Sequence, residues 1–297
     1  SCNFSNMSWF KLRRFVLKWT HYEYWPWLFF YIPVVPYYLY LTIKARWFFY
    51  STAANPGIDL GGLFGESKID ILNHFSEEFK PKTFFHTATS VASETINEIS
   101  NRSFEFPVIA KPNIGERGDK VEKIESKAAL QAFLETTNAD FIIQEYVDYP
   151  IELGVLYGRQ PNEQKGSVRS IVMKRFLTVT GDGKQTVKDL LLKNPRAWFQ
   201  IERLEIEKPE LVNSIPESGV EVMVEPIGNH CRGTEFINAN HLINENVNAV
   251  FDKIAAQFEG FYYGRFDLKV RSIEEFNRGE KIRIFELMLE SKREKNR

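Results

Sequence analysis

The fold is decided by two apolar runs, Phe261-Tyr-Tyr-Gly-Arg-Phe-Asp-Leu-Lys-Val270 and Lys281-Ile-Arg-Ile-Phe-Glu-Leu287. Both are β-like, and a short polar connector joins them, which is typical of paired strands. Asp267 and Glu286 lie among apolar and aromatic neighbours, where a lone carboxylate is costly to bury. Two carboxylates facing one point suit a hard divalent metal, and the neighbouring Arg265 suits phosphate oxygens.

Composition excludes several classes of protein. The 297 residues suffice for two or three subdomains with cores of their own. Lys and Arg number 38 against 39 Asp and Glu, so no global field attracts nucleic acid, and we expect no nucleic-acid partner. The two cysteines, Cys2 and Cys231, argue against a disulfide framework and favour a reducing, cytoplasmic location.

An aromatic segment occupies residues 1–60. Tyr24–Ile43 carries no formal charge and has basic residues on both sides, and its length would suffice for a membrane span. Its three prolines and five tyrosines argue against a straight helix embedded in lipid. Three alternatives remain: an arm packed on its own domain, peripheral contact of residues 10–50 with the inner face of a membrane, or, the least favoured, a true membrane span.

The rest of the chain intermixes strands and helices without a regular βαβ alternation, which favours an α+β fold. Turn chemistry at Ala53–Gly57 and at Gly61-Gly62 marks a boundary after the aromatic segment. We expect strands at 106–111, 141–147, 155–158 and 167–179, and helices at 66–75, 127–134, 187–192 and 246–258. The last helix should have one apolar face, formed by Val247, Val250, Phe251, Ile254 and Phe258.

Two further stretches have both a functional and a structural interpretation. Lys111 ends an apolar strand and precedes a glycine loop, Asn113–Gly118, which would suit a phosphate clamp or an ordinary surface hairpin. The run Gln144–Val147 would be a plain core strand, or a hinge whose backbone binds an adenine, with Glu152 available to a ribose.

The order of these pieces, from about residue 65 to 287, resembles the ATP-grasp superfamily. Within it, the chain resembles a bacterial branch of the D-alanine–D-alanine ligase-like carboxylate–amine ligases. The resemblance implies two α+β subdomains with mainly antiparallel sheets that clasp the nucleotide. They would span residues 61–297, with a lid at about 105–145 and a C-terminal subdomain at about 146–297.

The resemblance implies an ATP-dependent ligase that joins a carboxylate to an amine through an acyl phosphate, with two Mg²⁺ ions. It assigns Arg265 to the transferred phosphoryl group, and Asp267 and Glu286 to the metal. The implied nucleotide-binding residues are Lys68, Lys111, Gly115, Gly118, Gln144, Glu145, Tyr146, Val147 and Glu152. Arg232 and Lys184 would hold a substrate carboxylate or belong to surface loops.

The end of the chain departs from the family pattern. Position 288 is Met where the family has a metal-binding Asn, and a thioether is a poor ligand for Mg²⁺. The charged tail that follows has no core pattern, so we expect the domain to be incomplete at its end, through a frameshift. An ATP-grasp kinase that stops at phosphoryl transfer is one alternative to the ligase. The other is a nucleotide-binding, non-catalytic protein associated with a membrane.

Overall fold

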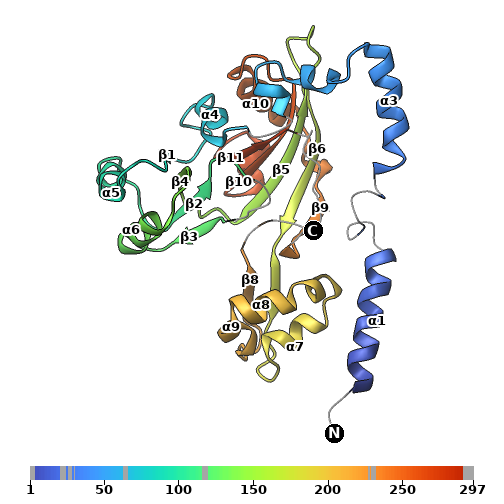
Figure 1. Ribbon diagram of the computed structural model, residues 1–297, viewed down its shortest axis with the longest axis vertical. Coiled ribbons are helices and arrows are strands. Elements are labelled where there is room, and N and C mark those ends of the chain that lie inside the picture. The colour runs from blue at the N-terminus through green and yellow to red at the C-terminus, as the bar shows by residue number, and fades with distance from the viewer. Residues whose placement is uncertain are drawn as a thin grey trace. The chain divides into compact units, whose positions relative to one another are not determined.

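The computed structural model describes residues 4–20, 25, 29, 31–62, 66–115, 120–226, 228 and 232–289. Helices and strands intermix along the chain, and the strand pairs whose register is defined are antiparallel (Figure 1). The predicted α+β class is therefore confirmed.

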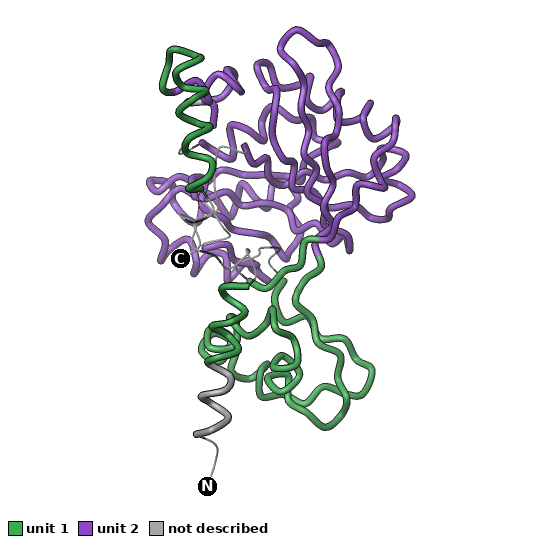
Figure 2. The backbone as a smooth tube through the Cα atoms, turned by 90° about the vertical axis from the view of Figure 1, so that its right-hand side faces the viewer, with its two compact units in different colours: residues 1–48, 175–236, 294–297 green, residues 49–174, 237–293 purple. Residues whose placement is uncertain are grey.

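The chain forms two compact units, which Figure 2 colours separately. Among the described residues, unit 1 joins the segment up to Phe48 to Arg175–Phe236, and unit 2 joins Phe49–Lys174 to the stretch from Ile237 onward. The domain boundaries that we expected from the sequence stay a prediction.

A four-stranded sheet in unit 2 has the order β1-β4-β2-β3. Helices α5 and α6 cover one face, where Ile99 and Leu130 pack on Val108, Ala110 and the alternate residues of β4. Because side chains alternate between faces, Lys111 and Gln144 lie on the opposite face. The bounds are β1 Thr83–His86, β2 Val108–Pro112, β3 Glu122–Ile124, β4 Phe141–Glu145, α5 Ala92–Asn101 and α6 Lys127–Thr136.

A five-stranded sheet has the order β11-β10-β5-β6-β9. Helix α10 packs on one of its faces, with Phe251 against Phe266 of β10 at a ring-centroid distance of 5.4 Å. The predicted apolar face of this helix is confirmed. The bounds are β5 Ile151–Gly158, β6 Ser167–Arg175, β9 Glu235–Asn238, β10 Tyr263–Val270, β11 Ile282–Met288, α10 Glu245–Ala256 and α11 Ile273–Asn277. Three short elements precede or connect these sheets: η2 Tyr50–Ala54, η3 Asp59–Gly62 and α4 Lys68–Asn73.

A bulge in β11 controls which face each of its residues occupies. Asp267 pairs with Glu286, but the next residue, Leu268, pairs with Ile284, so Phe285 is the additional residue. The core on the α10 side of the sheet takes Ile284 and Leu287. Glu286 therefore shares the opposite face with Asp267, away from that core.

Unit 1 has a small core of its own under the two-stranded sheet β7-β8, where Val187, Leu191 and Leu204 are buried. The predicted strand at 167–179 is wrong in one respect, because it is two strands, β6 and β7, in different sheets. The division falls after the basic pair Lys174-Arg175, and strand alternation alone does not show which sheet each half joins. The bounds are β7 Leu177–Thr180, β8 Glu221–Glu225, α7 Val187–Leu192, η4 Pro195–Phe199, α8 Ile201–Glu207, α9 Pro209–Asn213, α1 Phe4–Thr20 and α3 Val34–Ala45. The short helix η6, Asn240–Leu242, belongs to unit 2.

Gly154 of β5 lies where Arg265 and Asp267 approach the strand. A Cβ at this position would lie 2.9 Å from the Val172 side chain and 3.3 Å from that of Arg265. Gly154→Ala should therefore lower the free energy of unfolding by about 1–3 kcal/mol, because Val172 is β-branched and cannot easily turn away. Urea unfolding measures this, and a Val172→Ala background should relieve part of the loss. An equal loss in both backgrounds would contradict the steric account.

Candidate functional site

The strands β5, β6, β10 and β11 bring charged side chains to one face of the five-stranded sheet. Asp267 lies opposite Glu286 on one side and opposite Gly154 on the other. Glu152 pairs with Lys174 across β5 and β6. Directly opposite residues of antiparallel strands lie on the same face. The two carboxylates that the sequence predicts as metal ligands are thus brought together.

Lys174 is the centre of a buried charge network. Its Nζ donates to Glu152 Oε1 at 2.7 Å and to Asp267 Oδ2 at 2.8 Å, and Arg265 Nε donates to Asp267 Oδ1 at 2.8 Å. The side chains of Lys174, Glu152 and Asp267 are almost wholly buried. The strands β5, β6 and β10 thus each contribute one of these charged side chains to a single hydrogen-bonded network. Arg265, also on β10, extends that network.

Burial and charge act in opposite directions on the pKa values in this network. Burial acts to raise the pKa of Asp267, but Lys174 and Arg265 outweigh it, so this pKa lies below its ordinary value. Burial raises the pKa of Glu152, and Lys174 only partly offsets that effect. Burial acts to lower the pKa of Lys174, but Asp267 and Glu152 outweigh it and raise this pKa.

Lys174 was missed in the sequence. A signal was present, because Lys174 follows the apolar run Ile171-Val-Met173 in an expected strand. The same reasoning that selected Asp267, a charge among apolar neighbours, applies to it. The local sequence does not show which strand pairs with this one, so it does not indicate that two carboxylates surround the lysine.

Lys111 lies buried on the face of the four-stranded sheet that is opposite α5 and α6. Its Nζ donates to Gln144 Oε1 at 3.0 Å and to the carbonyl oxygen of Phe285, the additional residue of the bulge, at 2.7 Å. Burial lowers the pKa of Lys111 to about 8, Glu286 opposes this effect, and Lys68 adds to it. Within unit 2, Lys111 therefore joins the two sheets beside Glu286.

Lys68 is brought to the glycine loop by Asn113. The Asn113 side-chain oxygen accepts from the Ile69 N–H at 3.1 Å, and its backbone oxygen accepts from the Lys68 N–H at 3.2 Å. Lys68 Nζ donates to the Gly115 carbonyl oxygen at 2.5 Å. Hydrogen bonds thus join the start of α4 to the loop after β2, and a role of this loop in phosphate binding stays a prediction. Gly118 lies outside the described residues.

The predicted adenine hinge, Gln144–Val147, comprises the last two residues of β4 and the two residues after it. The Glu145 N–H donates to the Lys82 carbonyl at 2.9 Å, and the Val147 carbonyl accepts from Lys269 Nζ at 3.1 Å. The Tyr146 ring contacts two ammonium groups, those of Lys123 at 4.6 Å and Lys269 at 5.1 Å from its centroid. Roles in adenine binding for these residues, and in ribose binding for Glu152, remain predictions.

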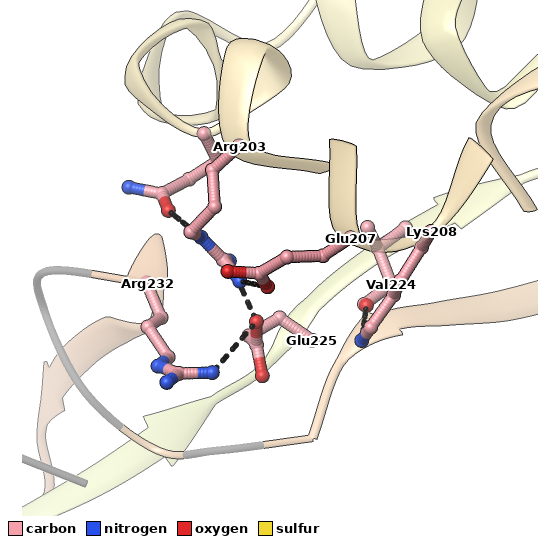
Figure 3. Close-up of polar contacts among 7 residues, drawn as sticks. Arg203, Glu207, Lys208, Val224, Glu225 and Arg232 are labelled. Atoms are coloured by element: carbon pink, nitrogen blue, oxygen red, sulfur yellow. Dashed lines mark hydrogen bonds and ion pairs between the residues drawn. The ribbon is translucent and has the colours of Figure 1, made fainter. Parts of the chain in front are cut away.

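The two predicted substrate residues belong to unit 1. Arg232 Nη1 lies 3.5 Å from Oε2 of Glu225, a residue only 1% exposed, to which Arg203 Nη2 also donates at 2.7 Å (Figure 3). Lys184 is exposed in a turn, where its N–H donates to Asp182 Oδ1 at 2.9 Å. A role in substrate binding stays a prediction for both.

Asp267 and Glu286 fit a magnesium–nucleotide site. Mg²⁺ takes one or two protein carboxylates and completes its shell with water and substrate phosphates. An ionised carboxylate has about four lone-pair sites, so Asp267 retains capacity beyond its bonds to Lys174 and Arg265. Among the residues that the structure describes, no group of three His, Cys, Asp or Glu could hold a metal by itself. The Met288 sulfur contacts Arg265 Nη2 at the end of β11.

Removing the ammonium of Lys174 should leave two buried carboxylates without a cation. Lys174→Met should therefore lower the free energy of unfolding by about 3–5 kcal/mol, measured by urea denaturation. The matched control is Lys253→Met, because Lys253 forms an exposed ion pair with Glu78 in the same unit. Its loss should stay below about 1 kcal/mol. Similar losses in the two variants would show that the buried network is not what holds these strands.

Comparison with known proteins gives one family match and several similar structures. Residues 77–152 match a family model described as a RimK-like ATP-grasp domain. No curated protein matches the sequence. A bifunctional glutathione synthetase from Pasteurella multocida is 15% identical with a TM-score of 0.39, covering 74% of this chain and 31% of that one. A D-alanine–D-alanine ligase from Bacillus anthracis is 15% identical with a TM-score of 0.40, covering 75% and 54%.

The VanG D-Ala:D-Ser ligase from Enterococcus faecalis is 11% identical with a TM-score of 0.40, covering 71% of this chain and 48% of that one. This chain thus spans about half or less of the length of these three structures. The family match includes the four-stranded sheet with Lys111 and Gln144 and ends at Glu152. The predicted resemblance to the ATP-grasp superfamily is therefore confirmed over residues 77–152, which match a RimK-like ATP-grasp domain.

Proposed function

We propose that this protein is an ATP- and Mg²⁺-dependent ligase that joins a carboxylate to an amine through an acyl phosphate. The observation that supports the proposal best is the charged face of unit 2. There, Lys111 and Lys174 lie next to the carboxylates of Glu286 and Asp267, respectively, and Arg265 is bonded to Asp267. Cations and metal ligands at one point are what phosphoryl transfer requires, since the protein mainly positions and screens charge.

In the first step, a substrate carboxylate oxygen attacks the γ-phosphorus of ATP, and the bond from that phosphorus to the bridging oxygen breaks. ADP leaves and an acyl phosphate forms. The amine nitrogen then attacks the acyl carbon, the carbon–oxygen bond to phosphate breaks, and the nitrogen loses a proton. The products are an amide and inorganic phosphate. Mg²⁺ held by Asp267 and Glu286 would neutralise charge on the β- and γ-phosphates.

The other side chains have separate roles in the proposal. Lys111 and Lys68 bind phosphate oxygens, Lys68 from the start of α4 beside the glycine loop. Arg265 steadies the group in transfer, with Asp267 holding its guanidinium in place. Arg232 and Lys184 of unit 1 remain the side chains predicted for a substrate carboxylate, and we propose a cytoplasmic location for the reaction.

Two other functions remain in competition with ligation. An ATP-grasp kinase would stop after the first step. A nucleotide-binding protein without catalysis is favoured by Met288, whose thioether contacts Arg265 at the position where the family resemblance expects an Asn ligand. A soft sulfur ligand does not replace an amide oxygen for Mg²⁺.

Release of ADP distinguishes the three functions. The full chain is incubated with ATP, Mg²⁺ and pools of amino acids and small peptides. For a ligase, ADP release should require both a carboxylate and an amine, and Met288→Asn should increase its rate because an oxygen ligand is restored. ADP release with a carboxylate alone would indicate a kinase. Bound ATP with no ADP from any pool, in the chain and in Met288→Asn, would indicate the non-catalytic protein.

The lowered pKa of Lys111 makes ATP binding depend on pH. Because this pKa is about 8, Lys111 should lose its proton as the pH rises above that value, and ATP affinity should fall by up to about tenfold per pH unit. Lys111→Arg should keep its charge and flatten the profile. Titration calorimetry between about pH 7 and pH 10 measures both profiles.

Lys111→Ala should weaken ATP binding about tenfold to a hundredfold at neutral pH, the effect of losing one charged hydrogen-bond donor. The matched control is Lys127→Ala, an exposed lysine at the start of α6. ATP affinity equal to that of the unmodified protein in Lys111→Ala would exclude the assigned nucleotide site.

A further inference from the structure

An apolar stripe along α1 faces solvent. Leu12, Phe15, Val16 and Trp19 follow one another at helical spacing on a single side, and each is exposed by 44–62%. In an ordinary amphipathic helix of a globular protein, a stripe with this spacing faces the core. Here two aromatic rings and two aliphatic side chains remain uncovered.

The opposite side of α1 contacts the rest of unit 1. Arg14 Nη1 donates to Glu202 Oε1 at 2.6 Å, and the Arg14 guanidinium lies 5.2 Å from the centroid of the Phe199 ring. Arg14 and Leu17 are the half-buried residues of the described part of this helix. The side of the helix that carries Arg14 and Leu17 therefore contacts the rest of unit 1, and the apolar stripe on the other side stays exposed.

The next helix of the aromatic segment, α3, buries none of its residues, although its sequence is mostly apolar. Its exposed side chains include Tyr37 at 62%, Tyr40 at 57% and Ile43 at 77%. Trp19 and Phe29 are in edge-to-face contact at 5.9 Å, so the exposed aromatic side chains continue beyond the end of α1. None of the described helices is long and apolar enough to cross a bilayer.

The first 50 residues are positively charged, whereas the rest of the chain is negatively charged. Residues 1–50 hold six Lys and Arg against one acidic residue, Glu23, whereas the whole chain has a net charge of −1. The first 50 residues therefore carry about +5, and the remainder carries an excess of negative charge. Arg13 and Lys18 lie on α1 at the two borders of the apolar stripe, as its helical spacing requires.

We propose that α1 and α3 bind in the plane of an anionic lipid bilayer, with the stripe Leu12, Phe15, Val16 and Trp19 inserted at the level of the headgroups. Trp and Tyr rings favour that level, and Arg13 and Lys18 reach the lipid phosphates from the borders of the stripe. Negative membrane charge complements the +5 segment and repels the rest of the chain. The proposal does not depend on the ligase function.

Flotation of the full chain with vesicles tests this inference. The protein should float with vesicles of phosphatidylglycerol and phosphatidylcholine, and much less with phosphatidylcholine alone. Phe15→Ser combined with Trp19→Ser should reduce binding more than about tenfold, because most of the inserted area is lost. Arg13→Glu and Lys18→Glu should each reduce binding to anionic vesicles at least about fivefold, and added salt should reduce the effect.

The matched control is Ile215→Ser combined with Met223→Ser, two residues of unit 1 that are exposed by 55% and 51% but lie outside the segment. This control should float like the unmodified protein. Thermal unfolding of each variant verifies that folding is retained. Failure to float with any vesicle, or equal losses in the control, would overturn the inference. So would a dimer in light scattering that dissociates with Phe15→Ser and Trp19→Ser, because a second copy would then cover the stripe.

Discussion

The ammonium group of Lys174 is the interaction on which the charged face depends. It lies between Glu152 and Asp267 in a nearly water-free environment, where neither carboxylate would stay ionised without a cation. The lysine comes from β6 and the acids from β5 and β10, so the network also holds the register of three strands. A slip of one residue would turn these charges toward the α10 core and the apolar side chains toward the opposite face.

The β11 bulge adds Glu286 to the face of the five-stranded sheet that carries Lys174 and Asp267. In a regular strand without the bulge, alternation would direct Ile284 and Glu286 to the same side, and the acid would lie in the core. The bulge turns Glu286 toward Asp267 and leaves the Phe285 carbonyl to accept the Lys111 ammonium. One irregularity thus positions a candidate metal ligand and ties the four-stranded sheet to the five-stranded one within unit 2. Bulges commonly re-aim side chains next to functional sites.

The aromatic segment differs from the sheets of unit 2 in where its apolar side chains lie. Residues that bury apolar surface in unit 2 do so against strands and helices of the same unit. In α1, the contact with unit 1 is made by Arg14, and the apolar stripe is left over. Arginine can make such a contact because its planar guanidinium both stacks on a ring, here that of Phe199, and pairs with a carboxylate. The apolar side of α10 is thus buried in the core of unit 2, whereas the apolar side of α1 is exposed and the opposite side of α1 makes the contact.

The α+β class and the apolar face of α10 follow from the sequence alone, because alternation and helical spacing are local properties. Asp267 and Glu286 were also selected from the sequence, as acids among apolar neighbours. The sequence also determined the order of the lysine, glycine-loop and acid segments, which carries the family resemblance. Long-range strand pairing, in contrast, places Lys174 between Glu152 and Asp267, makes Phe285 the additional residue of a bulge, and divides the run at 167–179 between two sheets. Local periodicity shows which residues share a face, whereas long-range strand pairing decides which faces and charges meet.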